Sequence, residues 1–136
     1  MQDALEDLRT RLLEINDLQS AAALLSWDQS THMPPRGAPA RGRQMATLGR
    51  LAHEKLTDPE VGRLLDRLEA SGATDPYDSI DASLVRVTRR DFDRATKIPA
   101  GFLADMRRHG AASYQAWTRA RPANDFAAVE GMLAQT

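Results

Sequence analysis

The sequence predicts an all-α fold, and two observations lead to this class. Leu and Ala together supply 38 of the 136 residues, whereas Val, Ile, Phe, Tyr and Trp together supply 14. The first group favours helices and the second favours strands. Apolar residues also recur at intervals of three and four along most of the chain, which is the repeat of an amphipathic helix. We expect about six helices in a single helical domain over residues 1–136.

The first predicted helix, from residue 3 to about residue 27, is the longest. No Gly or Pro interrupts it, and its apolar residues keep the helical spacing (Leu5, Leu8, Leu12, Ile15, Leu18, Ala22 and Leu25). The uncharged stretch 18–27 is too short to cross a bilayer, and we expect it to be a buried helix segment. Pro34 and Pro35 stop any helix, because proline lacks an amide donor and pushes the residue before it toward extended backbone. An ordered loop should therefore occupy residues 31–39.

Each later helix has a start or a stop signal. Pro39 suits the first turn of the second helix, which should end near Leu56. Thr57 or Asp58 caps the third helix, Pro59 takes its first turn, and Ser71 and Gly72 end it. The remaining helices are expected to carry residues 80–95 with an end before Pro99, then about 100–120, and then from near 124 or 125 to the end of the sequence.

Composition excludes several classes of protein. The chain has 18 Lys and Arg against 19 Asp and Glu, so its bulk charge does not favour a polyanion binder. Cysteine is absent, which excludes disulfide scaffolds, zinc ribbons, iron–sulfur sites and cysteine nucleophiles. No apolar run approaches the roughly 18 residues of a membrane span, and the acidic N-terminus is unlike a signal peptide. We therefore predict a cytoplasmic protein.

The sequence predicts no catalytic, cofactor-binding or metal-ligating residue. A helical zinc site would read His-Glu-x-x-His, because residues four apart share one face. The nearest string begins at His53 and Glu54, but Thr57 stands where the second histidine is needed. We expect His53 and Glu54 to be solvated residues near a helix end. No serine-nucleophile elbow, P-loop or dinucleotide fingerprint is present.

Two basic clusters and two tryptophans have alternative interpretations. The clusters could contact nucleic acid, but a solvated helix face with intrahelical ion pairs is the simpler interpretation (Arg36, Arg41, Arg43 and Arg50; Arg86, Arg89, Arg90, Arg94 and Lys97). Trp27 and Trp117 are expected to pack in the core or between helices. Asp28 could accept hydrogen bonds from loop amides, the usual role of a turn aspartate, or pair with Arg41.

Four segments of the chain resemble the N-terminal region of the carboxypeptidase Taq family of zinc metallocarboxypeptidases. They are LLSWDQSTHMPPRGAPARGRQ at 24–44, LAHEKLTDPE at 51–60, RDFDRATKIP at 90–99, and WTRAR at 117–121 followed by Asp125 and Phe126. They occur in the same order as in the family and without large gaps. The resemblance therefore covers essentially the whole chain.

The resemblance implies an elongated all-α peptidase, usually a homodimer, which trims peptide C-termini with a metal-bound water and a glutamate base. In that family the zinc or other divalent metal is held well downstream of the region matched here, so no catalytic residue carries over. His53 and Glu54 match an N-terminal family position instead. The matched positions are expected to form scaffold or groove wall (Trp27, Asp28, Thr31, Met33, Arg41, Gln44, Trp117 and Arg121).

These observations predict a catalytically incomplete N-terminal helical module, either a natural truncated paralogue or a fragment of a longer enzyme. Helices that evolved to pack against a larger body should expose apolar faces, so we expect a homodimer or a higher oligomer. One alternative is a regulatory or adaptor protein that binds a full-length carboxypeptidase. Another is a weak nucleic-acid binder that acts through its basic helix faces.

Overall fold

The computed structural model describes residues 1–135, with the side chain of Ala100 left out, and it confirms the all-α class. Those residues form six α-helices and one short 3₁₀ helix, with no strand among them. The elements are α1 (Gln2–Thr31), η1 (Pro35–Gly37), α2 (Ala38–Leu56), α3 (Pro59–Ala70), α4 (Ile80–Ala95), α5 (Ala100–Ala123) and α6 (Ala127–Leu133).

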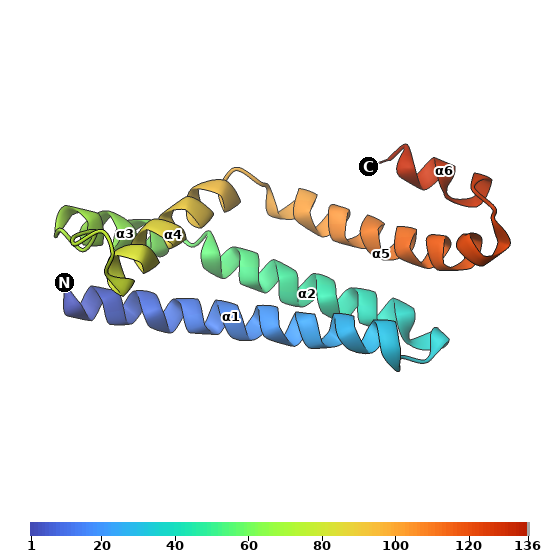
Figure 1. The fold of residues 1–136 in the computed structure, drawn as a ribbon, viewed down its shortest axis with the longest axis horizontal. Coiled ribbons are helices and arrows are strands. Elements are labelled where there is room, and N and C mark those ends of the chain that lie inside the picture. Colours follow the sequence, from blue (N-terminus) through green and yellow to red (C-terminus); the bar gives the residue numbers. More distant parts are fainter. Residues whose placement is uncertain (136) are drawn as a thin grey trace.

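The helices form an elongated arrangement around an antiparallel hairpin of α1 and α2 (Figure 1). Helices α3 and α4 gather at the end of the hairpin where α1 begins. Helix α5 then runs along α2 toward the other end of the molecule, and α6 folds back beside it. Helix α2 therefore has α1 on one side and α5 on another.

Local sequence signals explain most of the helix boundaries. The Asp58 carboxylate accepts a hydrogen bond from the Glu60 amide at 2.9 Å, and Pro59 is the first residue of α3, as predicted. The Ser79 hydroxyl caps α4 by accepting from the Ala82 amide at 3.0 Å. Helix α1 continues to Thr31, beyond the predicted end near Trp27, because no proline occurs before Pro34.

The two C-terminal helices differ from prediction by a few residues. Helix α5 continues through Pro122 to Ala123, and Asn124 ends it in the left-handed conformation with φ of 53°. Asparagine adopts this conformation more readily than most residues. Helix α6 is shorter than expected and spans Ala127–Leu133.

The largest cluster of buried apolar residues lies at one end of the molecule, which we call the packed end. The first turns of α1, the inner face of α3, the loop after α3 and one face of α4 supply it (Leu5, Leu8, Val61, Leu65, Leu68, Ala73 and Val85). The side chains of Leu8, Leu65 and Leu68 are completely buried. Their spacing of three and four along each helix brings them to one face.

The other end, which we call the open end, consists of residues 18–31 of α1, residues 38–49 of α2, and α5 with α6. Here the prediction that residues 18–27 are buried is wrong. Leu24 is 64% exposed and Trp27 is 57% exposed. Helix α2 covers only one face of this stretch, and no other described helix covers the opposite face.

None of the helices in the described part of the chain is both long enough and apolar enough to cross a membrane.

Candidate functional site

The hairpin turn between α1 and α2 is held by Arg41, which lies in the first turns of α2. Its Nη2 donates to the Asp28 carboxylate at 2.6 Å, its Nη1 donates to the Leu25 carbonyl at 2.6 Å, and its Nε donates to the Gln44 side-chain oxygen at 3.3 Å. The Arg41 side chain is only 14% exposed. One guanidinium therefore ties the end of α1 to the start of α2.

Backbone groups complete this turn. The amides of His32 and Met33 both donate to the Asp28 carbonyl at 2.9 Å, and the Thr31 hydroxyl donates to the Trp27 carbonyl at 2.8 Å. The Asp28 carboxylate therefore pairs with Arg41, which is one of the two roles considered for this residue. The loop amides bind its carbonyl oxygen instead.

Neither tryptophan lies in the core, which is one of the two locations predicted for them. Trp27 is exposed on the last turns of α1, with its ring centroid 5.4 Å from that of His32. Trp117 is 45% exposed on α5, and it lies between the Tyr114 ring, 6.2 Å away, and the Arg121 guanidinium, 5.3 Å away. Both rings lie on faces that the described helices leave largely uncovered.

The predicted scaffold residues therefore fall into two groups. Five surround the hairpin turn (Asp28, Thr31, Met33, Arg41 and Gln44), with Trp27 beside them, whereas Trp117 and Arg121 lie on α5. Met33 lines a cavity of about 390 Å³ whose other wall is α5 at Tyr114, Gln115, Thr118 and Arg119. Their common role as groove wall stays a prediction.

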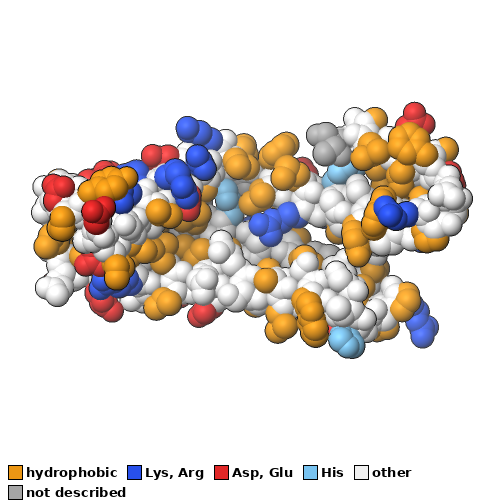
Figure 2. Space-filling model, in the orientation of Figure 1, with side chains coloured by type: hydrophobic (Ala, Val, Ile, Leu, Met, Phe, Trp, Pro, Cys, Tyr) orange, Lys and Arg blue, Asp and Glu red, His pale blue; other side chains and the backbone are white. Residues whose placement is uncertain are grey.

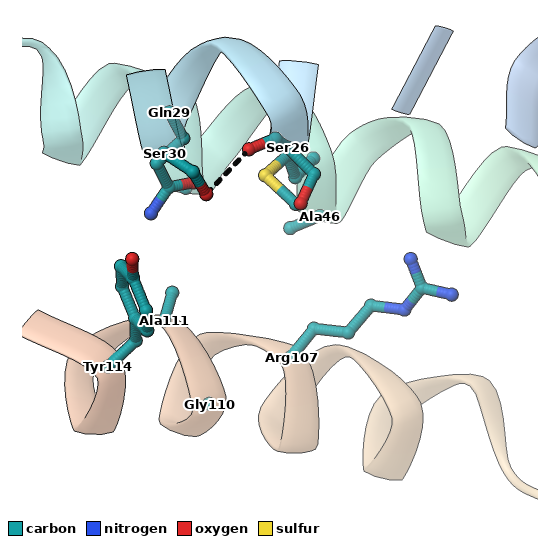
Figure 3. Close-up of a pocket in the computed structure, with 10 residues that line it drawn as sticks. Ser26, Gln29, Ser30, Ala46, Arg107, Gly110, Ala111 and Tyr114 are labelled. Carbon is teal, nitrogen blue, oxygen red and sulfur yellow. Dashed lines mark hydrogen bonds between the residues drawn. The ribbon is translucent and has the colours of Figure 1, made fainter. Parts of the chain in front are cut away.

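Two further cavities continue along the contact between α5 and the hairpin. One, of about 240 Å³, has Ser26, Gln29 and Ser30 of α1 on one side and Arg107 and Tyr114 of α5 on the other (Figure 3). In this view Tyr114 points toward Gln29 and Ser30, and Arg107 reaches toward α2. The other cavity, of about 340 Å³, has both apolar and polar residues in its walls (Leu18, Gln19, Ala22, Leu48, Gly49, Ala52, His53, Leu56, Leu103 and Arg107).

We call these three cavities together the seam groove. Gln29 and Tyr114 each line two of them, and so does Arg107. The space-filling view shows the surface hollowed between α5 and the hairpin (Figure 2). This groove was not predicted from the sequence. The available signal was the spacing of small residues, Gly110 and Ala111 among them, along the fifth predicted helix.

The described residues do not supply the ligands of a zinc site. No three of their His, Asp or Glu side chains lie close enough together to hold a metal ion. His53 is partly buried, and its Nε2 donates to the Ile98 carbonyl at 3.1 Å, whereas Glu54 pairs with Arg50 at 2.8 Å. His53 is therefore only partly solvated, whereas Glu54 is exposed. We derive no catalytic step through a metal from these residues.

The basic cluster on α4 is partly engaged within the molecule. Arg89 binds Asp66 and Glu69 of α3, and the hydrogen bond to Glu69 raises the pKa of its guanidinium above the usual value. Arg86 donates to the Tyr77 carbonyl at 2.8 Å, with its guanidinium 3.7 Å from the centre of the Tyr77 ring. The ion pairs of Arg89 join two helices, so they are not the intrahelical pairs that we expected.

Comparison with known proteins gives consistent results. A model of the carboxypeptidase Taq (M32) metallopeptidase family matches residues 7–136. The thermostable carboxypeptidase 1 of Thermus thermophilus is 37% identical over 109 residues, which cover 80% of this chain and 21% of the relative. The chain thus spans about a fifth of that relative's length.

Solved structures show the same relationship. The M32 carboxypeptidase of Deinococcus radiodurans R1 aligns over 98% of this chain and 26% of its own, with 39% identity and a TM-score of 0.71. BsuCP aligns over 98% of this chain and 26% of its own, with a TM-score of 0.89 at 21% identity, a likeness of fold. The chain belongs to the carboxypeptidase Taq (M32) metallopeptidase family.

Proposed function

We propose that this chain is a non-catalytic helical module of an M32 carboxypeptidase, and that its open end binds a further polypeptide body and forms one wall of a peptide-binding groove. In this arrangement the other body supplies the metal ligands and the general base. The observation that carries the proposal is the contrast between a packed end with buried leucines and an open end with a groove and exposed apolar side chains.

The exposed apolar residues support an association role. Seven large apolar side chains of the open end are at least 45% exposed (Leu24, Trp27, Phe102, Met106, Trp117, Phe126 and Leu133). Exposed apolar surface that gathers on one part of a molecule usually marks an interaction site. The packed end also has a cavity, of about 390 Å³, but charged side chains line part of it (Asp3, Asp7 and Arg67), whereas three cavities follow the contact between α5 and the hairpin, so we assign association to the open end.

The catalytic part of the proposal is tested first with the purified chain. Incubation with zinc or cobalt and a blocked dipeptide is expected to release no C-terminal residue. A chimera of the Thermus thermophilus relative, with its matched 109 residues replaced by this chain, is expected to trim peptides in a chelator-sensitive way. Hydrolysis by the chain alone, or a folded but inactive chimera, would contradict the proposal.

Self-association is tested by sedimentation. When no other polypeptide is present, the simplest partner for the open end is a second copy of this chain. A homodimer or a higher oligomer is therefore expected at high concentration. Mixing the chain with the full-length Deinococcus radiodurans enzyme distinguishes an adaptor. An adaptor should bind the complete enzyme. A module that is equivalent to the N-terminal helices should not bind it, because the complete enzyme already contains those helices. A chain that stays monomeric and is inactive in the chimera would overturn the association role.

A further inference from the structure

Arg107 differs from the other arginines of its helix. Arg108 pairs with Asp105, Arg119 donates to the Gln115 carbonyl at 3.2 Å, and Arg121 lies beside the Trp117 ring. Within residues 1–135, the Arg107 guanidinium has no hydrogen-bond, ion-pair or aromatic-ring partner. A guanidinium that is not matched by an anion in its surroundings is a favourable place for one to bind.

The position of the Arg107 guanidinium depends on a glycine of α2. A Cβ atom at Gly49 would lie 1.9 Å from Arg107 Nη1 and 2.4 Å from Cζ, so only glycine leaves room for this contact. Gly49 itself is buried. The guanidinium therefore lies against the α2 backbone, where the 240 Å³ cavity and the 340 Å³ cavity of the seam groove meet.

The walls of the seam groove complement an anion with apolar neighbours. None of the residues that line its three cavities is an aspartate or a glutamate, while two of them are arginines, Arg107 and Arg119. Leucines and alanines form most of the wall on one side of Arg107, and Met45, Ala46 and Ala111 contribute on the other. Arg107 itself is exposed, so an anion can reach its guanidinium, and a charge-assisted hydrogen bond is stronger than one between neutral groups.

We propose that the seam groove binds a peptide segment in which an Asp or Glu side chain, paired with Arg107, is flanked by apolar residues that fill the two adjacent cavities. The inference rests on the proposed function, and the segment belongs to the further polypeptide body named there. The matched relatives offer such a body, because the chain spans only 21% of the Thermus thermophilus protein and 26% of the Deinococcus radiodurans protein. The groove runs along two helices, which suits an extended or helical segment better than a compact ligand.

The chemistry of the site is tested with hexanoate, which has a carboxylate and a short apolar tail. Titration into the ¹⁵N-labelled full chain should shift the Arg107 Nε resonance saturably, whereas hexylamine should not. Arg107→Gln should weaken hexanoate binding at least about tenfold. Gly49→Ala should weaken it as well, by displacing the guanidinium, while Arg43→Gln, on an exposed face of α2 outside the groove, should leave it unchanged. Equal binding by the wild-type chain and Arg107→Gln, or no binding, overturns the proposal.

The identity of the occupant is tested with synthetic 15-residue peptides that cover the Thermus thermophilus relative outside its matched 109 residues. The full chain should bind peptides that have Asp or Glu between apolar residues. Asn or Gln in place of the acid, or Arg107→Gln in the chain, should remove that binding. Failure to bind any such peptide, or binding that does not depend on the acid, overturns this inference. An active chimera would leave the proposed function standing in that case, so the two failures are distinguishable.

Discussion

The packed end and the open end both consist of α-helices, yet they differ in how much of their apolar surface other helices cover. At the packed end, apolar faces of α1, α3 and α4 meet and bury seven core residues. At the open end, α5 faces the hairpin across three cavities, and large apolar side chains remain exposed. The comparison indicates that the buried apolar packing is concentrated at one end, whereas the other end leaves apolar side chains exposed.

Two arginines illustrate the same difference. Arg89 at the packed end binds two carboxylates of α3, and its side chain is 21% exposed. Arg107 at the open end lies against Gly49 of α2 and has no such carboxylate among the described residues.

Removal of a core side chain should have the largest effect. Leu65→Ala at the packed end should lower the free energy of unfolding by about 2–5 kcal/mol, because it creates a cavity among buried leucines. Leu24→Ala at the open end, where the side chain is 64% exposed, should change it little. Urea denaturation monitored by circular dichroism measures both. Similar losses for the two variants would contradict the division into two ends.

Two glycines provide the next test. A Cβ at Gly62 would lie 2.9 Å from the ring atom Cζ of Phe92, so Gly62→Ala should cost about 1–3 kcal/mol through overpacking. A Cβ at Gly110 meets nothing within 4 Å, so Gly110→Ala should stabilise the helix by about 0.5–1 kcal/mol. Thermal unfolding of both variants should give shifts of opposite sign. Destabilisation by both substitutions would show that α5 is packed as closely as α3, and stabilisation by both would show that Gly62 is not tightly packed.

Side-chain hydrogen bonds of Arg41 stabilise the hairpin turn at the open end. Arg41→Ala should destabilise the chain by about 1–2 kcal/mol, because it removes three hydrogen bonds and leaves the partly exposed Asp28 carboxylate unpaired. Amides of residues 32 and 33 should then exchange faster with deuterium. Arg43→Ala is the control and should leave their exchange rates unchanged. If Arg41→Ala behaves like this control, the turn does not depend on Arg41.

The smallest effect concerns an exposed ion pair that joins α1 to α2. Lys55 donates to Glu14 at 2.6 Å, and this hydrogen bond and the lysine charge hold the pKa of the Glu14 carboxyl below its usual value. A lowered folded-state pKa contributes stability above the usual glutamate pKa of about 4.3, and the contribution is lost as the pH falls through the folded-state value.

Glu14→Gln should therefore be slightly less stable than the wild-type chain at pH 7, and the difference should vanish as the pH falls through the lowered folded-state pKa of Glu14. Denaturation midpoints measured across this range check the sign. A difference that persists or grows at low pH would show that Glu14 acts through packing rather than charge.

Several features of the fold could be predicted from the sequence, because their causes are local. Proline and the Asp58 cap define the start of α3, and the helical repeat of leucines identifies the face that α1 buries at the packed end. The possible partnership of Asp28 and Arg41 could also be inferred, because the two residues flank one short turn. The exposure of Trp27 could not, since burial depends on which helix lies opposite.

The helical class, most of the helix boundaries and the family could be inferred from the chain alone, since these depend on residue spacing, caps and motifs. Which faces are covered, which carboxylates pair with Arg89, and the position of Arg107 against Gly49 beside the groove became known only from the packing of the helices. The physical reason is that helix formation depends on neighbours within about one turn. Burial and ion pairing between helices depend instead on residues brought together from distant parts of the chain.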